Sequence, residues 1–155
     1  MRINKFLFVA LAASLSLQSC KKDEEKKEPT KTDHLQNGKW KLASANAAGG
    51  VFDLMTSLKD CQKDNLYTFN ADKTITVDEG ATKCSSSASQ SVTEGNWALL
   101  KGDAQMSISG ERITAGFGNL TGDVITIDAK TLQIKKDTTV SGFATTAIVT
   151  FTNVK

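Results

Sequence analysis

The sequence is poor in the residues on which most enzymes depend. It has one histidine, His34, one proline and three cysteines among its 155 residues. Acid–base, nucleophilic and transition-metal chemistry mostly relies on histidine, free cysteine or clustered carboxylates. The acidic residues are instead scattered among turn-like segments, where Asp bonds the local backbone, and the pair Asp78–Glu79 offers few oxygens for calcium. We therefore expect no catalytic residue, no cofactor, no metal site and no enzymatic activity.

A long apolar run is also missing. The longest, residues 6–17, has about a dozen residues, fewer than the roughly 20 that cross a bilayer. Because Arg2 and Lys5 precede it, the run is typical of a signal peptide over residues 1–19. It ends in Leu17-Gln18-Ser19-Cys20, which resembles the lipobox of bacterial lipoproteins. That resemblance implies that Cys20, whose thiolate is a good nucleophile, carries the lipid. The alternative is ordinary secretion with an unmodified Cys20.

The mature chain has no excess of charge of either sign. Without Arg2 and Lys5 the 19 basic residues become 17, which equals the 17 acidic residues. A balanced, interspersed charge gives no electrostatic footprint for nucleic acid. Attachment to a membrane would therefore come from acyl chains on Cys20, which are sufficient for stable anchoring when two or more are present.

Residues 20–34 are charged and almost free of apolar side chains. Such a segment cannot bury enough surface to become ordered, so we expect a flexible tether. Lys22 followed by Asp23, Glu24 and Glu25 resembles a surface-export signal of one group of Gram-negative bacteria. This resemblance implies a lipoprotein of the outer membrane that faces the cell surface, whereas a tether facing the periplasm is the alternative.

Three cysteines leave one unpaired, and lipidation of Cys20 would leave Cys61 and Cys84 as a pair. An oxidising compartment permits a disulfide. The runs 65–69 and 74–77 form a predicted hairpin in which Phe69 faces Ile75. Continuing that register places the two cysteines almost opposite each other, within reach of a disulfide. A zinc pair is the competing hypothesis, but two cysteines without a nearby histidine make a poor zinc site.

Residues 35–155 form a segment of single-domain size with a period of two in its apolar residues. Trp40 and Leu42 alternate with polar or small residues, as do Trp97 and Leu99. The turn at Gly102-Asp103 predicts a hairpin that sets Leu99 against Met106 and Trp97 against Ile108. A third predicted hairpin sets Ile125 against Ile134 and Ile127 against Leu132. Further strands are expected over residues 112–117 and 147–151.

About eight strands joined by short turns form an all-β, antiparallel meander, and such meanders usually close into a barrel. One segment, residues 51–60, breaks the pattern. Its apolar residues Val51, Leu54, Met55 and Leu58 follow the spacing of a short amphipathic helix. This segment is therefore expected to cover one end of the barrel, either as a helix or as an irregular apolar loop.

Several motifs in this order resemble the lipocalin-like domain of bacterial lipoproteins. They are Gly38-Lys39-Trp40, Cys61-Gln62-Lys63-Asp64-Asn65 with Tyr67-Thr68-Phe69, Asp72-Lys73-Thr74, Cys84, and Gly95-Asn96-Trp97. The resemblance spans most of residues 35–155 and implies an eight-stranded lipocalin-like barrel with a binding role.

Two functional hypotheses follow, and both assume a monomer. In the first, the barrel encloses a small hydrophobic or amphipathic ligand, and the wall residues include Trp40, Phe69, Trp97 and Phe151. In the second, those side chains fill the barrel, and the outer loops act as a display or adhesion module that contacts glycan or protein. Small eight-stranded barrels can be hollow or filled, so the pattern alone leaves both open.

Overall fold

The computed structural model describes residues 27–114 and 119–155. The predicted signal peptide, Cys20 and the first part of the tether lie outside the described residues. The described elements are α1 Lys31–Gln36, β1 Lys39–Ala47, η1 Ala48–Gly50, β2 Phe52–Asp53, η2 Leu54–Ser57, α2 Asp60–Lys63, β3 Leu66–Phe69, β4 Thr74–Asp78, β5 Ser91–Leu100, β6 Gln105–Ser109, α3 Glu111–Thr114, β7 Leu120–Ile127, β8 Thr131–Val140 and β9 Phe143–Val154.

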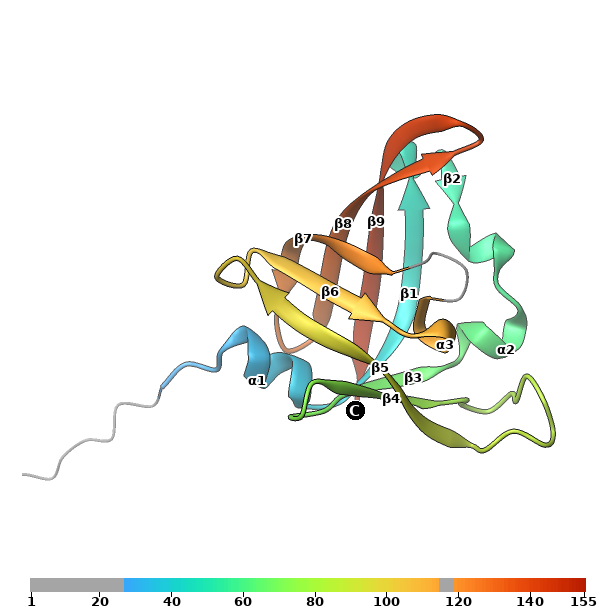
Figure 1. Ribbon diagram of the computed structural model, residues 1–155, viewed down its shortest axis with the longest axis vertical. Helices are drawn as coiled ribbons and strands as arrows, with labels where there is room; N and C mark the ends of the chain where they lie inside the picture. The colour runs from blue at the N-terminus through green and yellow to red at the C-terminus, as the bar shows by residue number, and fades with distance from the viewer. Residues whose placement is uncertain (1–26, 115–118) are drawn as a thin grey trace, which may run out of the picture.

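Strands β1 and β3–β9 form a closed, eight-stranded antiparallel barrel, which confirms the predicted fold class. The barrel closes where β1 pairs with β9, from Lys39 opposite Val154 to Ala47 opposite Ala147. The short strand β2 is an addition that pairs with the end of β1. Figure 1 shows the strands curving around one core, with the short helices at the ends of the barrel. Closure pairs the edge strands, which would otherwise present free backbone groups.

Two of the predicted hairpins have the expected register. Phe69 pairs with Ile75 across β3 and β4, and Trp97 pairs with Ile108 across β5 and β6. In the β5–β6 turn, Gly102 has a φ of 62° and Asp103 has a φ of 65°. Positive φ at both central residues is the geometry that matches the twist of paired strands. The turn chemistry therefore determines this register locally.

The third predicted hairpin is correct only near its turn. Ile127 pairs with Leu132 as expected, but Ile134 faces Val124 and not Ile125. A register shift between Val124 and Thr126 causes the difference, because a bulge adds one residue to β7. Ile125 is consequently 47% exposed.

The expected strand over residues 112–117 is wrong in its described part. Residues 111–114 form helix α3, and residues 115–117 lie outside the described residues. The Glu94 side chain on β5 accepts a hydrogen bond from the backbone N–H of Arg112 at 2.7 Å. Ile113 is buried. These tertiary contacts favour a helical turn over an extended strand.

The segment over residues 51–60 is an irregular apolar connection and not one continuous helix. It contains β2 and the 3₁₀ helix η2. The Asp53 side chain caps η2 by accepting a hydrogen bond from the Met55 N–H at 2.9 Å. Val51 is 76% exposed, whereas Leu58 is buried in the core. The apolar spacing therefore correctly marked a segment that packs partly against the barrel.

Ordered structure begins before Leu35, inside the segment assigned to the tether. Thr30 and Asp33 form a reciprocal capping box that starts helix α1. Leu35 on this helix is fully buried, and the Lys31 Nζ donates to the Asp103 carbonyl of the β5–β6 turn at 2.9 Å. Capping and apolar contact together attach the helix to the barrel.

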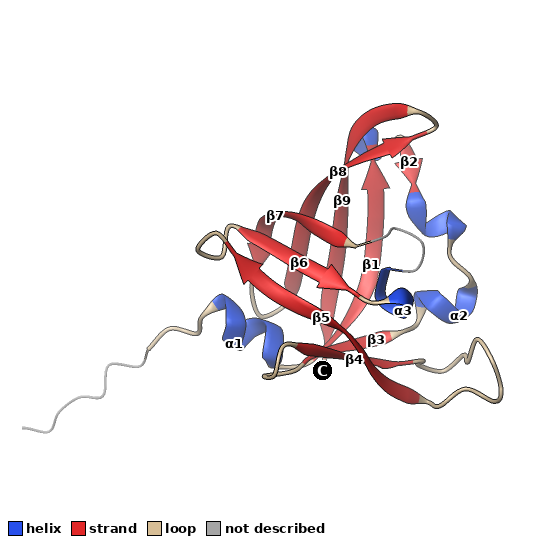
Figure 2. Ribbon diagram, in the orientation of Figure 1, coloured by secondary structure: helices blue, strands red, loops and turns tan. Residues whose placement is uncertain are grey.

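The two ends of the barrel differ. A meander places its connections alternately at its two ends, so α1 lies with the β3–β4, β5–β6 and β7–β8 turns at what we call the α1 end. The opposite end, which we call the loop end, carries η1, η2, α2, α3 and the β4–β5 and β8–β9 connections (Figure 2). Leu35 packs into the core at the α1 end, and Leu58 and Ile113 join the core from segments at the loop end.

Candidate functional site

The four aromatic residues expected in the barrel wall lie in the packed core. Trp40, Phe69, Trp97 and Phe151 are each at most 2% exposed. Phe69 makes edge-to-face contacts with both tryptophans, at centroid distances of 6.4 Å to Trp40 and 5.8 Å to Trp97. The Trp40 indole N–H donates to the Leu35 carbonyl, and that of Trp97 donates to the Asn70 carbonyl. Their polar atoms are thus satisfied within the fold.

A cavity of about 270 Å³, which we call the apolar cavity, lies at the loop end. Its described lining residues come from η2, β7, β8 and β9: Leu54, Ser57, Leu120, Lys136, Thr138, Thr139, Val140, Ala147 and Val149. The four core aromatics do not line it. Leu54 belongs to the segment that was expected at the barrel end, and Met55 and Leu58 of that segment pack against or within the core. Sequence patterning had no signal for the β8 residues, which fall on an ordinary polar strand.

The structure contains the expected disulfide between Cys61 and Cys84. The two Cα atoms are 5.1 Å apart. Cys61 lies on α2, and Cys84 lies in the β4–β5 connection. The bond therefore joins two segments at the loop end that are not neighbours in the sequence.

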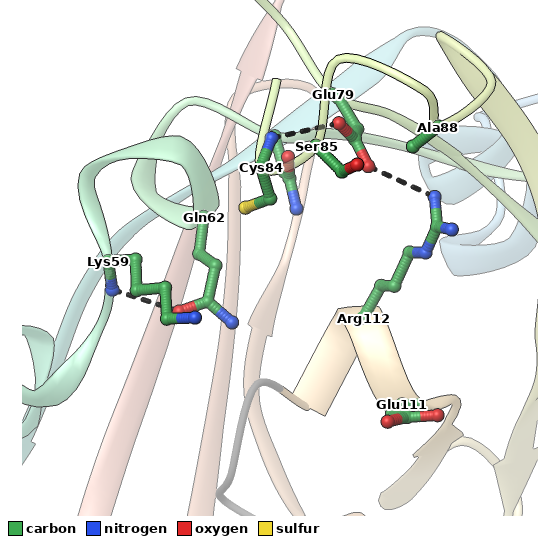
Figure 3. Close-up of a pocket in the computed structure, with 9 residues that line it drawn as sticks. Lys59, Gln62, Glu79, Cys84, Ser85, Ala88, Glu111 and Arg112 are labelled. Atoms are coloured by element: carbon green, nitrogen blue, oxygen red, sulfur yellow. Dashed lines mark hydrogen bonds and ion pairs between the residues drawn. The ribbon is translucent and has the colours of Figure 1, made fainter. Parts of the chain in front are cut away.

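A second cavity, of about 370 Å³, lies beside the disulfide, and we call it the polar cavity (Figure 3). Its lining residues are Lys59, Gln62, Asn65, Glu79, Cys84, Ser85, Ala88, Glu111 and Arg112. Figure 3 shows the Arg112 side chain extending from α3 toward Glu79, with Lys59 and Gln62 on the opposite side. The two cavities share no lining residue.

Glu79 is a buried charged residue in the lining of this second cavity. Glu79 is only 4% exposed. One carboxylate oxygen accepts from Arg112 Nη1 at 3.1 Å, and the other accepts from the Cys84 backbone N–H at 3.1 Å. The Arg112 Nε also lies 3.5 Å from a Glu94 oxygen. Sequence reasoning placed Glu79 in a solvated turn, because nothing near it in the sequence indicates that Arg112 meets it in space.

Burial alters the ionisation of the chain's one tyrosine. Tyr67 is 1% exposed on β3. Burial raises the pKa of its phenol, a hydrogen bond from Asn65 opposes the rise and the negative charge of Glu94 adds to it, so that the pKa moves from 10.0 to about 12. Tyr67 therefore stays neutral, and its ring packs edge-on against Phe151 at 5.8 Å.

Across residues 27–114 and 119–155, no cluster of three or more His, Cys, Asp or Glu side chains has the arrangement of a metal site. Within the same ranges, no helix is long and apolar enough to span a bilayer.

The closed antiparallel meander of eight strands, with an apolar cavity at one end, defines a β-barrel of the lipocalin type. Comparison with protein families agrees, since the profile of the lipocalin-like domain matches residues 37–134. The chain belongs to the lipocalin-like domain family. Proteins of this family are typically binding proteins and not enzymes. A search of curated proteins finds no match.

Proposed function

We propose that the protein binds a small hydrophobic or amphipathic molecule in the apolar cavity. The observation that carries the proposal is a depression at the loop end of the barrel in which five of the nine described lining residues are apolar. At about 270 Å³ the cavity is near the lower limit of small-molecule pockets, which is roughly 300 Å³. The ligand is therefore small, or it inserts one end of a longer chain.

The lining suggests how affinity and orientation arise. Leu54, Leu120 and Val149 offer apolar surface, and each Å² buried contributes about 25 cal/mol before the costs of association. Thr138 places a hydroxyl in the same wall. An amphipathic molecule would bury its apolar part against the leucines and hydrogen-bond with the threonine side.

The probe N-phenyl-1-naphthylamine, which fluoresces in apolar surroundings, tests this proposal. Thr138→Phe fills the cavity and should weaken probe binding at least about tenfold, a loss of about 1.4 kcal/mol. Thr146→Phe is the matched control, because Thr146 is exposed on the adjacent strand and does not line the cavity. Equal binding by both variants, or no saturable binding by the wild type, would exclude the apolar cavity as the site.

We propose further that the protein is lipid-anchored through Cys20, the residue that follows the lipobox-like Leu17-Gln18-Ser19. Metabolic labelling with an alkyne fatty acid should mark the wild type and leave Cys20→Ala unmarked. Cys61→Ala combined with Cys84→Ala serves as a control, because it removes the other two cysteines and should leave labelling intact. Labelling that survives Cys20→Ala would refute the anchor.

The acidic run after Lys22 supports a location on the outer face of the outer membrane. Protease added to intact cells should then remove the domain, while a periplasmic marker stays protected. Replacing Asp23, Glu24 and Glu25 by Ala should restore protection. A wild-type domain that resists protease until the outer membrane is opened would place the protein in the periplasm.

A second function is favoured by the packed interior. Because the four core aromatics fill the barrel and Leu58 and Ile113 pack into it from loop-end segments, the barrel can also serve as a rigid support for loops that contact glycan or protein. If Thr138→Phe no longer binds the apolar probe but still binds a glycan array, the result would favour this display role.

A further inference from the structure

We propose that the polar cavity is a second binding site and that it accepts an uncharged, polyhydroxylated molecule such as a single sugar unit. The proposal concerns residues that do not line the apolar cavity, so it goes beyond the ligand proposed above. The volume of the polar cavity, about 370 Å³, lies within the range of roughly 300–1,000 Å³ that is usual for small-molecule sites.

The walls of this cavity are held in place by several independent bonds. The disulfide joins α2 to the β4–β5 connection. The Asp64 carboxylate, just after α2, accepts from two backbone N–H groups of that connection, those of Ala81 at 3.1 Å and Thr82 at 2.8 Å. Glu79 accepts from the Cys84 N–H. A loop fixed in this way loses little conformational entropy when a ligand binds.

One buried polar atom in the wall lacks a hydrogen-bond partner. Asn65 is 4% exposed, lines the cavity, and its side-chain oxygen has no hydrogen-bond partner. A buried acceptor without a partner costs about 1–3 kcal/mol. Arg112 lines the same cavity, its side chain is 36% exposed, and its ion pairs use Nη1 and Nε. The cavity wall thus contains one acceptor without a partner, the Asn65 side-chain oxygen.

The charges around the cavity favour a neutral ligand. Arg112 is already paired with Glu79 and Glu94, so an anion drawn to the guanidinium would meet two carboxylates. A cation drawn to Glu79 would meet Arg112, and both Glu79 oxygens already accept hydrogen bonds. A hydroxyl carries no charge and can both donate and accept. It can therefore donate a hydrogen bond to the Asn65 oxygen without bringing a charge into the cavity.

The test is saturation-transfer NMR on the full chain in lauryldimethylamine oxide, a detergent without a sugar headgroup. The neutral probes are methyl α-glucopyranoside, N-acetylglucosamine and myo-inositol. Glucuronate and glucosamine serve as matched probes with one negative and one positive charge. At least one neutral probe should give saturable transfer, and the charged probes should bind at least about tenfold more weakly.

Two cavity variants and one control variant locate the binding. Ala88→Trp places an indole in the cavity and should abolish transfer, whereas Ser89→Trp, at an exposed position on the same connection but outside the cavity lining, should leave it unchanged. Asn65→Leu removes the free acceptor and should weaken binding about tenfold. No saturable transfer from any neutral probe, tighter binding of a charged probe, or equal transfer by the Ala88 and wild-type proteins would each overturn the proposal. Thr138 does not line the polar cavity. Loss of the apolar probe in Thr138→Phe therefore tests the apolar cavity alone, and loss of sugar binding in Ala88→Trp tests the polar cavity alone.

Discussion

The buried residues of this barrel include two polar side chains among the apolar ones. Among the described residues, Asn65 and Glu79 are the polar side chains in the most buried class, each 4% exposed. A buried carboxylate needs a charged or hydrogen-bonding partner, and Glu79 has both Arg112 and the Cys84 N–H. Removing Arg112 would therefore leave an unpaired buried charge, which is costly.

The burial of Tyr67 predicts how the stability of the protein changes at alkaline pH. The folded-state pKa of Tyr67, about 12, lies above the ordinary value of 10.0. Its contribution to stability is therefore complete below pH 10 and is lost as the pH rises to about 12. The free energy of unfolding should fall by about 1.4 kcal/mol per pH unit over this window.

Because Tyr67 is the one tyrosine of the chain, tyrosinate absorbance at alkaline pH reports on it alone. Urea unfolding of the wild type and of Tyr67→Phe should diverge only above about pH 10. A midpoint near 10 in the folded protein would show that the phenol is accessible to water and would contradict the burial argument.

The core residues could be predicted from sequence more completely than the site residues. Trp40, Tyr67 and Ile108 lie on the buried face that period-two patterning assigned to them. Burial of an apolar side chain depends mainly on strand alternation, which is local. Asn65 and Arg112 become important only because the fold brings them together, and polar residues in connections carry no pattern that reveals this.

At the scale of elements, the turns decide which strands pair and where. Lys73 has a φ of 70°, a conformation that favours glycine. Its ammonium lies 3.8 Å from the centroid of the Trp97 ring, and Trp97 also donates through its indole N–H to the Asn70 carbonyl of the same turn. A cation–π contact of about 0.5–1 kcal/mol offsets part of the backbone cost.

Gly95 in β5 should not tolerate a side chain. It has a φ of 70°, and an added Cβ would collide with the Ser109 carbonyl on β6. Gly95→Ala should therefore destabilise the protein by about 3 kcal/mol or more, from left-handed strain plus overpacking. Gly102→Ala is the control, because Gly102 has a φ of 62° but open space around it. Equal thermal-denaturation midpoints for the two variants would contradict the close approach of β6 to β5 at Gly95.

The disulfide should stabilise the loop end. It closes a loop with a sequence separation of 23 residues, which is worth about 3 kcal/mol on the chain-entropy account. Mass spectrometry without reduction should find the Cys61 and Cys84 peptides linked. The double replacement by Ala should lower the urea midpoint, whereas Cys20→Ala should not. Two free thiols in freshly isolated protein would rule out the bond.

Elements that depend on local chemistry could be predicted, and elements that depend on distant contacts could not. The hairpins of Phe69–Ile75 and Trp97–Ile108 follow from alternation and turn residues. The bulge near Ile125 leaves no mark on the apolar pattern. Helix α3 depends on Glu94, which is 18 residues from Arg112 in the sequence.

At the scale of the whole molecule, closure of the barrel and the occupation of its two ends determine what it can bind. Pairing of β1 with β9 follows from the number of strands, so an eight-stranded barrel could be predicted from the meander. Whether the interior was hollow could not, because that depends on the volumes of facing side chains. Trp40, Phe69 and Trp97 pack together inside, and the apolar cavity and the polar cavity lie at the loop end.

The most direct test of the central claim, that the apolar cavity holds a small hydrophobic or amphipathic molecule, is native mass spectrometry of the protein released from its own cell envelope. The wild type should retain a noncovalent mass that dissociates on collisional activation and extracts into organic solvent. Thr138→Phe should lack it, and Thr146→Phe should retain it. A wild-type protein of unliganded mass, or the same bound mass in both variants, would contradict the proposed binding function.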